Sequence, residues 1–395
     1  MKNVIFKDDQ FASQTLRLLG VATFGMADIG EVLTTAEKVT EGDYDSWCKE
    51  WTGTAKRLHA VADDYYKNRH PVSAKKTYLR AYNYYRTAEF FLHGNPNDPR
   101  ITQLYEASLA CFARVMELND PVIESVKIPY EGTTLPGHYY KCQKALKPSP
   151  VLILMTGFDG TKEELYGMAM AALEHGMNCL VFEGPGQGEA LHRQHLYFRY
   201  DYEAVVTPVV DFVLSLDGVD PGKIVLMGES LGGFLAPRAA AYEHRLTACV
   251  ANNGVYSLAL AFNPDMVSAD PDKFNQNFDK MAKANPSLKW GCENGMYVFG
   301  VDTPAQVILK MKDFTMEGVV EKIQCPTLIT DAEDDKISEG QAKLLYDALT
   351  CEKSYMLFTS EEGAGKHCES GAKILSDERI FSWIDERLLN SASGK

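Results

Sequence analysis

The first third of the chain carries a helical pattern of apolar residues. From about residue 42 to residue 118, apolar side chains recur at spacings of three and four, as at Trp47, Trp51 and Leu58, which is the periodicity of one helix face. Pro71 and the Asn-, Gly- and Pro-rich run 94–99 divide this pattern into hairpins. We therefore predict an all-α domain over residues 1–120.

After Pro121 the pattern changes to short apolar runs of strand length. Residues 122–129 and 137–141 are predicted to be antiparallel strands around a tight turn. Further strands are predicted at 151–155, 178–182, 223–227, 248–251, 327–330 and 354–358. Near-continuous apolar strands that alternate with amphipathic helices are typical of a mostly parallel sheet covered by helices on both faces.

One interval breaks the alternation of strands and helices. Residues 257–320 are too long and too polar for a single crossover helix, so we expect an inserted helical cap there. The sheet core then has two parts, residues 121–256 and 321–395. Such an insertion is expected above the carboxyl edge of the sheet, where ligands of open α/β folds bind.

The composition is that of a folded globular protein, with 45% hydrophobic residues. Its 40 Lys and Arg against 54 Asp and Glu give a net charge of −14, which repels nucleic-acid backbones and anionic membranes. No apolar run reaches the roughly 18 residues of a membrane span, and no secretory apolar segment opens the chain. Nine cysteines without a close C-x-x-C pair indicate reduced thiols. We expect a cytoplasmic protein that binds neither nucleic acid nor membrane.

One motif carries recognisable chemistry. The apolar strand 223–227 runs into Gly228-Glu-Ser230-Leu-Gly232, and an alanine-rich helix follows. This context is typical of a nucleophile elbow, whose flanking glycines avoid collisions with the neighbouring strand and helix. The N–H of Leu231, at the start of the helix, is placed to hold a developing oxyanion. Ser230 is therefore the candidate nucleophile.

A serine hydroxyl needs a base, and the base needs an acid that orients it. His367 is the one histidine after the last predicted strand, and it lies in a glycine-containing loop that can extend over the sheet. We predict His367 to be the general base. The order serine, acid, histidine along the chain is that of α/β-hydrolases.

The acid is expected soon after the strand that ends at Thr330. The next five residues hold four carboxylates, so residue type alone does not choose among them. An apolar residue usually stands two positions after the acid. Ile337 meets this condition for Asp335, whereas Asp334 would put Lys336 there. We predict Asp335 as the acid, with Asp334 as the alternative.

Two further loops complete the predicted site. The second oxyanion donor is expected after strand 151–155, where the N–H of Phe158 is our candidate because Gly157 lets the backbone approach the serine. The glycine-rich run 183–189 matches neither GxxxxGK[ST] nor GxGxxG, so it does not indicate a dinucleotide site. We interpret it as a tight loop beside the active site, and we expect neither a cofactor nor a metal ion.

Four segments together resemble a known family. They are residues 157–164, 182–189, 228–233 and 362–368. Their sequences are similar to those of α/β-hydrolases with an N-terminal helical domain. That family includes 2,6-dihydroxypseudooxynicotine hydrolase and the fungal hydrolases that shorten polyketides in melanin-type pathways. The resemblance implies an α/β-hydrolase fold in which the helical domain and the insertion close over the pocket, and it implies a homodimer.

The resemblance also implies Ser230 as nucleophile, Asp335 as acid and His367 as base, in agreement with the choice made from the residues. The leading hypothesis is a serine hydrolase that cleaves a carbon–carbon bond, in a retro-Claisen sense, or an ester bond of an aromatic or polyketide-like small molecule. Within the same class, a carboxylesterase, lactonase or acyltransferase remains open. An alternative from another class is a non-catalytic binding protein with a hydrolase fold. The presence of all three candidate catalytic residues, Ser230, Asp335 and His367, argues against this alternative.

Overall fold

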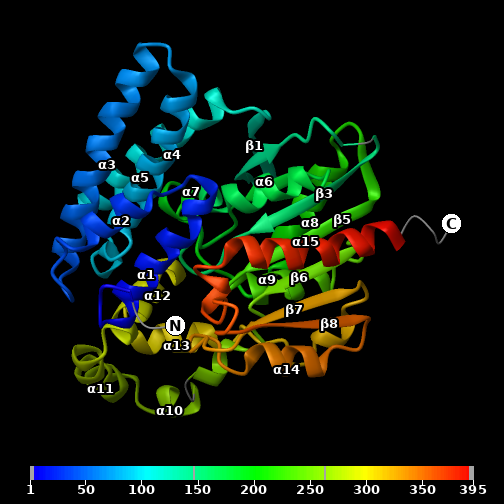
Figure 1. Cartoon of the computed structure of the whole chain (residues 1–395). Coiled ribbons are helices and arrows are strands. Elements are labelled where there is room, and N and C mark those ends of the chain that lie inside the picture. The colour runs from blue at the N-terminus through cyan, green and yellow to red at the C-terminus, as the bar shows by residue number, and fades with distance from the viewer. Residues whose placement is uncertain (1–3, 146, 262–263, 391–395) are drawn as a thin grey trace. The chain divides into compact units, whose positions relative to one another are not determined.

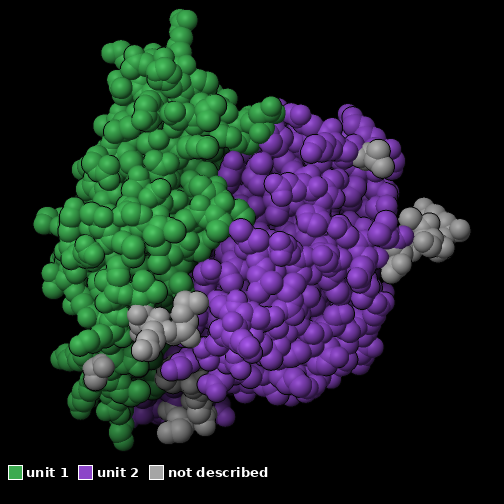
Figure 2. Space-filling model, in the orientation of Figure 1, with its two compact units in different colours: residues 1–120, 271–297, 301–304 green, residues 121–270, 298–300, 305–395 purple. Residues whose placement is uncertain are grey.

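The computed structural model describes residues 4–145, 147–261 and 264–390. It divides into two compact units, coloured separately in Figure 2. The helical unit comprises residues 1–120, 271–297 and 301–304, and the sheet unit comprises residues 121–270, 298–300 and 305–395. About half of the predicted insertion, residues 271–297 and 301–304, thus groups with the N-terminal helices, and the rest of it belongs to the sheet unit. The roles predicted for these parts, as lid, dimerisation domain and cap, stay predictions.

Helices cover most of residues 42–118 of the helical unit, as the spacing of apolar residues predicted, and further helices lie outside that range. Its helices are α1 (Asp9–Gly20), α2 (Ile29–Ala36), α3 (Tyr44–Lys67), α4 (Pro71–Glu89), α5 (Pro99–Leu118), α11 (Pro271–Ala284) and most of α12 (Pro286–Phe299). Asp43 caps α3 by accepting a hydrogen bond from the Ser46 N–H, which satisfies one of the free donors of the first turn. Trp47, Trp51 and Tyr78 are fully or almost fully buried and form the core between α3 and α4.

Helix α12 is held to the N-terminal helices by aromatic and polar contacts within this unit. The Trp290 ring stacks on Phe90 at a centroid distance of 4.6 Å, and its Nε1 donates to the Phe90 carbonyl at 3.1 Å. His93 is hydrogen-bonded to Asn294 at 2.6 Å and stacks on Tyr297 at 4.3 Å. Composition alone did not indicate these partners, because none of them belongs to a recognisable motif.

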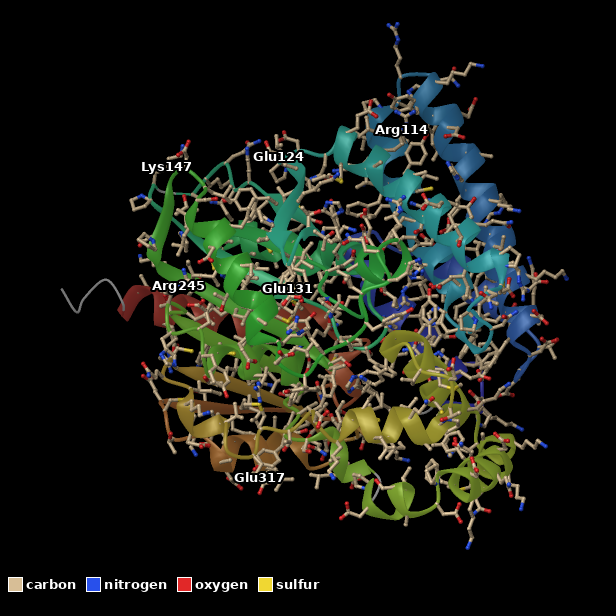
Figure 3. The ribbon with its side chains drawn as sticks, turned by 180° about the vertical axis from the view of Figure 1, so that it is seen from behind. Arg114, Glu124, Glu131, Lys147, Arg245 and Glu317 are labelled. Atoms are coloured by element: carbon tan, nitrogen blue, oxygen red, sulfur yellow. The ribbon has the colours of Figure 1, made fainter. Side chains whose placement is uncertain are left out.

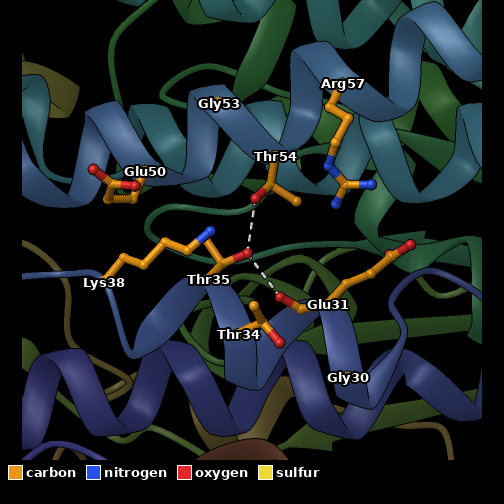
Figure 4. A pocket seen from close by; sticks show the side chains of 9 residues that line it. All are labelled: Gly30, Glu31, Thr34, Thr35, Lys38, Glu50, Gly53, Thr54 and Arg57. Carbon is orange, nitrogen blue, oxygen red and sulfur yellow. Dashed lines mark hydrogen bonds between the residues drawn. The ribbon is translucent and has the colours of Figure 1, made fainter.

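A polar pocket of about 430 Å³ opens on the helical unit between α2 and α3 (Figure 4). Threonines and charged side chains line it, and the hydroxyls of Thr35 and Thr54 are 2.8 Å apart at its base. Its lining residues are Gly30, Glu31, Thr34, Thr35, Lys38, Glu50, Gly53, Thr54 and Arg57. None of the residues predicted to carry chemistry lies in this pocket.

The sheet unit contains eight strands in the order β1-β2-β4-β3-β5-β6-β7-β8. They are β1 (Ile123–Tyr130), β2 (Thr133–Tyr140), β3 (Ser149–Met155), β4 (Asn178–Phe182), β5 (Val219–Glu229), β6 (Ala248–Asn252), β7 (Thr327–Ala332) and β8 (Lys353–Phe358). Strand β2 is antiparallel to both β1 and β4, and all other pairs are parallel. Glu131, in the β1–β2 turn (Figure 3), pairs with Arg199 at 2.8 Å. The predicted mostly parallel sheet is confirmed.

Helices flank this sheet in Figure 1. Helix α6 (Tyr166–Glu174) packs on β4 and against α15 (Lys373–Asn390), while α8 (Glu203–Leu214) and α9 (Gly232–Ala240) pack on β5 and against each other. The remaining helices of the unit are α7 (Gly188–His192), α10 (Pro264–Ala269), α13 (Pro304–Met311) and α14 (Gln341–Ala348). Since the central strands are buried on both faces, their apolar runs are continuous. Among the described residues, no helix is both long and apolar enough to cross a membrane.

Candidate active site

Ser230 stands at a sharp turn between β5 and α9. Its φ of 63° lies in the left-handed region, a backbone conformation that residues other than glycine rarely adopt. A Cβ added to Gly228 would lie 2.1 Å from the Gly232 carbonyl oxygen, so a larger residue cannot stand there without moving the backbone. The Ser230 N–H donates to the Asn252 carbonyl at 2.9 Å, which fixes the turn to the adjacent strand β6. This is the geometry that the motif predicted for an elbow.

Three of the predicted residues form one chain of hydrogen bonds. The Ser230 hydroxyl lies 2.8 Å from Nε2 of His367, and Nδ1 of the same ring lies 2.8 Å from Oδ2 of Asp335. Ser230 and His367 are half-buried, whereas Asp335 is only 5% exposed. A serine, an imidazole and a carboxylate in this order can activate the hydroxyl for attack on a carbonyl carbon.

The two candidate acids occupy different environments. Asp335 receives hydrogen bonds from the Ile337 N–H at 2.8 Å and the Ser338 hydroxyl at 2.6 Å, in addition to its contact with His367. The carboxylate of Asp334 accepts a hydrogen bond from the Ser360 hydroxyl. The structure therefore brings Asp335, and not Asp334, to the imidazole. The Ile337 side chain is 68% exposed, so this position contributes through its backbone N–H.

Electrostatics at the site follow from the burial of charged groups. Burial alone would raise the pKa of Asp335, but its ionic and hydrogen-bonding contacts with His367 and Ser338 lower it well below the usual range. Burial lowers the pKa of His367, while Cys368 and Asp335 raise it, and the net pKa is well above the ordinary value. Since burial also raises the pKa of the Cys368 thiol, that thiol is neutral near pH 7. Asp335 therefore supplies the negative charge.

Asn253 supports the site and was missed by the sequence reasoning. Its Nδ2 donates to Oδ2 of Asp335 at 2.9 Å, and its Oδ1 accepts the N–H of Cys368 at 3.0 Å. It thereby ties the acid loop to the histidine loop. Asn253 has a φ of 57°, and Asn tolerates this conformation better than most residues. The available signal was the pair Asn252-Asn253 directly after a predicted strand, followed by Gly254.

The loop after β3 lies against the elbow. A Cβ added to Gly157 would lie 2.6 Å from the Leu231 nitrogen and 2.9 Å from the Ser230 Cβ, so only glycine permits this approach. Phe158, the next residue, is half-buried, and its ring lies 6.4 Å from the ring of Phe198. The structure thus brings the residues of both predicted oxyanion donors, Phe158 and Leu231, to the neighbourhood of the serine. Their role as donors stays a prediction.

A buried ionic cluster fixes the far end of the same loop. The Lys162 ammonium lies 2.8 Å from Glu163 and 3.0 Å from Glu183, and all three side chains are almost fully buried. The Glu183 carboxylate also accepts the backbone N–H groups of Lys162 and Glu189. Residues 183–189 therefore brace the loop that follows β3. Within the described part of the chain, no group of three His, Cys, Asp or Glu side chains is arranged to hold a metal ion.

Comparison with known proteins agrees with this architecture. A family model for the alpha/beta hydrolase fold matches residues 150–288. The chain is 36% identical to Hydrolase LUC6 of a Fusarium species, over 97% of each chain. It is 35% identical to the 20-hydroxy-prefusarin hydrolase FUS2 of Gibberella moniliformis, over 96% of this chain and 97% of that protein.

A solved structure shares the fold over nearly the whole length. The 2,6-dihydroxy-pseudo-oxynicotine hydrolase superposes with a TM-score of 0.75 at 22% identity, over 95% of this chain and 96% of that chain. The likeness to the two fungal hydrolases extends through both units and includes the segments that form the site. The chain therefore belongs to the α/β-hydrolase family of enzymes.

Proposed function

We propose that this enzyme is a serine hydrolase in which Ser230 is the nucleophile, His367 the general base and Asp335 the orienting acid. The observation that carries the proposal is the continuous chain of two hydrogen bonds, each 2.8 Å long, from the Ser230 hydroxyl through the imidazole to the carboxylate. The strained elbow conformation of Ser230 supports it independently, because strain of this kind is retained where function requires it.

In the proposed mechanism, Nε2 of His367 accepts the Ser230 proton while Oγ attacks a carbonyl carbon of the substrate. The N–H groups of Leu231 and Phe158 stabilise the oxyanion that forms. The bond to the leaving group then breaks, and His367 donates its proton to that group. Water hydrolyses the acyl-serine by the same route, so the net reaction adds water across the broken bond without oxidation or reduction.

We propose an aromatic or polyketide-like acyl compound as the substrate. The rings of Phe158, Phe198 and Phe299 cluster at centroid distances of 5.9–6.4 Å. Phe198 and Phe299 are buried, so Phe158, which follows the glycine that touches the elbow, is the ring of this cluster that can offer apolar surface to a flat ligand. The relative FUS2 is named for 20-hydroxy-prefusarin. From this relative we infer only that this chain, too, acts in secondary metabolism, and we do not transfer the relative's substrate.

Carbon–carbon cleavage is the reaction we favour within this class. A carbon leaving group must delocalise the negative charge left by the broken bond, and β-diketones and acylphenols do so. Esters and lactones need no such help, and acyl transfer to an alcohol uses the same residues if water is excluded. We also propose a cytoplasmic homodimer, which light scattering after size-exclusion chromatography would test.

The test is mass spectrometry of the purified enzyme with p-nitrophenyl esters, acylphenols and β-diketones, scoring both the products and any acyl adduct on Ser230. We expect an adduct on Ser230 and cleavage of the diketones. Ester turnover alone would make the enzyme a carboxylesterase, lactonase or acyltransferase.

Two variants control this experiment. Ser230→Ala should abolish both adduct and turnover and leave the thermal unfolding midpoint nearly unchanged. Ser268→Ala removes a hydroxyl on α10 that is exposed and donates to the Pro264 carbonyl, and it should retain full activity. Turnover by Ser230→Ala, or an unlabelled Ser230 in the folded protein exposed to a fluorophosphonate, would refute the proposal.

A further inference from the structure

The side-chain amide of Gln187 is buried between two loops of the sheet unit. Gln187 precedes α7 and is 1% exposed. Its Nε2 donates to the Thr156 carbonyl at 2.7 Å and to the Gly157 carbonyl at 3.3 Å. Its Oε1 accepts the Gly184 N–H at 3.0 Å and the Tyr202 hydroxyl at 3.2 Å. Four hydrogen bonds satisfy both donors and both acceptor positions of the amide.

This network fixes which way the amide faces. The Gly184 N–H can only donate, so the atom of Gln187 that meets it must be the oxygen. The two carbonyls on the other side can only accept, so the atom that meets them must be the nitrogen. A flipped amide would place donor against donor and acceptor against acceptor among buried residues, where a polar group without a hydrogen bond costs the most free energy.

The carbonyls that Gln187 holds determine the direction of the following N–H groups. In a trans peptide the C=O of one residue and the N–H of the next point to opposite sides. Among the described residues, the only cis peptide bond is Lys147–Pro148. Because the Gly157 carbonyl faces Gln187, the Phe158 N–H points away from Gln187. The same relation holds for the Thr156 carbonyl and the Gly157 N–H.

The held segment is also the one that touches the elbow. Gly157 approaches so closely that an added Cβ would lie 2.6 Å from the Leu231 nitrogen. A rotation of the Gly157–Phe158 peptide would therefore change the position of the Phe158 N–H relative to Ser230. The Glu183–Lys162 contacts fix the far end of this loop, and Gln187 fixes its beginning.

We infer that Gln187 is a positioning residue that orients the Gly157–Phe158 peptide so that its N–H can stabilise the oxyanion on the substrate. The inference rests on the proposed function, because it assigns a role in the reaction of Ser230. The inference assigns a function to the loop 183–189, which the sequence did not predict. Gln187 touches no reacting atom and acts through the backbone.

The test compares Gln187→Glu and Gln187→Met with the unchanged enzyme. The glutamate keeps the acceptors for Gly184 and Tyr202 but turns an oxygen toward the two carbonyls, and the methionine keeps the approximate volume without any polar atom. Since misplacing an oxyanion donor costs roughly 10²-fold in rate, we expect phosphonylation of Ser230 by a fluorophosphonate to slow by about 10- to 100-fold.

A second readout separates positioning from loss of structure. The inhibition constant of an arylboronic acid, which forms a tetrahedral adduct on the serine, should rise by a similar factor. The KM for a p-nitrophenyl ester should change by less than about threefold, because the defect concerns the oxyanion and not the bound ester. If Gln187 had a purely structural role, its substitution would change KM and kcat together, and the inhibition constant of the boronic acid would not change more than KM does.

Gln341 provides the matched control. Its Oε1 accepts the N–H groups of Tyr256 and Ser257, and its Nε2 donates to the Ser257 carbonyl at 3.0 Å. Gln341→Glu and Gln341→Met therefore break the same kind of bridge elsewhere in the sheet unit. In both variants we expect the rate at which a fluorophosphonate labels Ser230 to stay within about threefold of the rate in the unchanged enzyme.

The outcomes of this experiment are distinct. Gln187 variants that label as fast as the Gln341 variants would overturn the inference while leaving the proposed function intact. No labelling of Ser230 in the unchanged enzyme would instead overturn the proposed function. If Gln187→Glu does not fold, Gln187→Met decides the question by the same readouts.

Discussion

At the scale of single residues, the acid loop offers a direct comparison between neighbouring carboxylates. Asp335→Asn keeps the shape of the side chain but loses the charge that orients and stabilises the imidazole. We expect kcat to fall by roughly 10³- to 10⁴-fold. The measurement is steady-state turnover of whichever ester or diketone the unchanged enzyme cleaves.

Asp334→Asn is the matched control for that substitution. The Asp334 carboxylate accepts a hydrogen bond from Ser360, whereas the two ring nitrogens of His367 are paired with Ser230 and Asp335. We expect its kcat to stay within about threefold of the unchanged enzyme. If Asp334→Asn lowered kcat more than Asp335→Asn, the acid would be Asp334, and the assignment made from the hydrogen bonds would be wrong.

The raised pKa of His367 predicts the pH dependence of the reaction. A protonated imidazole cannot accept the Ser230 proton, so kcat/KM must rise with pH as His367 loses its proton. Because contacts with Cys368 and Asp335 outweigh burial and hold the pKa of His367 well above its ordinary value of about 6.5, the midpoint of this rise should lie above pH 6.5. In Asp335→Asn the residual activity should show a midpoint at lower pH. A midpoint below 6.5 in the unchanged enzyme would contradict the assigned charge on Asp335.

Much of the site follows from residue types and chain order. The glycines around Ser230 mark an elbow because no other residue fits there, and His367 follows from its place after the last strand. The partners of Asp335 could not be predicted in the same way. Asn253 reaches it from the turn that follows β6, and Ser338 is one of many loop serines. Such contacts depend on the register of β6 against β7, which a single sequence does not reveal.

At the scale of elements, the elbow requires a glycine at position 228, whereas the long helix α3 has room for a larger residue at Gly53. A Cβ at Gly228 would meet backbone atoms of α9 within 2.1–2.8 Å, and no rotamer can relieve that overlap. Gly53 lies in the middle of α3 with open space around its Cβ position and an ordinary helical φ. The same substitution should therefore have opposite signs at the two positions.

We expect Gly228→Ala to lower the free energy of unfolding by roughly 1–3 kcal/mol or more, and Gly53→Ala to raise it by about 0.5–1 kcal/mol. Thermal unfolding midpoints of both variants provide the measurement. A stabilised Gly228→Ala protein would show that the turn can relax and would weaken the argument for a strained elbow.

The apolar patterns predicted the elements well because each helix buries one face, which gives a helical period, and the central strands are buried on both faces, which gives short continuous apolar runs. The strand predicted at 223–227 is longer in the structure, Val219–Glu229. Its first four residues, Val-Asp-Pro-Gly, do not form an apolar run and were therefore not predicted as part of the strand. The predicted insertion appeared as a break in the alternation. The grouping of residues 271–297 with the N-terminal helices depends on specific aromatic contacts such as Trp290 with Phe90, and periodicity contains no information about such partners.

At the scale of the whole molecule, the two units are interleaved along the chain. The helical unit takes in residues 1–120 and then residues 271–297 and 301–304, so helix α12 depends on contacts with residues 200 and 201 positions earlier. Trp290 makes two of these contacts, the stack on Phe90 and the hydrogen bond to its carbonyl. Removing its ring should release α11 and α12 from the rest of the helical unit without affecting the sheet.

Trp290→Ala should therefore accelerate amide hydrogen exchange in residues 271–297 by roughly 10- to 100-fold, the change expected when a local opening becomes easier by about 1.4–2.8 kcal/mol. Trp383→Ala is the matched control, because Trp383 is a tryptophan of α15 whose Nε1 donates to the Ser354 hydroxyl at 2.9 Å. It should accelerate exchange in β8 and α15 and leave residues 271–297 unchanged. If both variants loosened the same residues, the two units would open as one body, and their separate cores would not act independently.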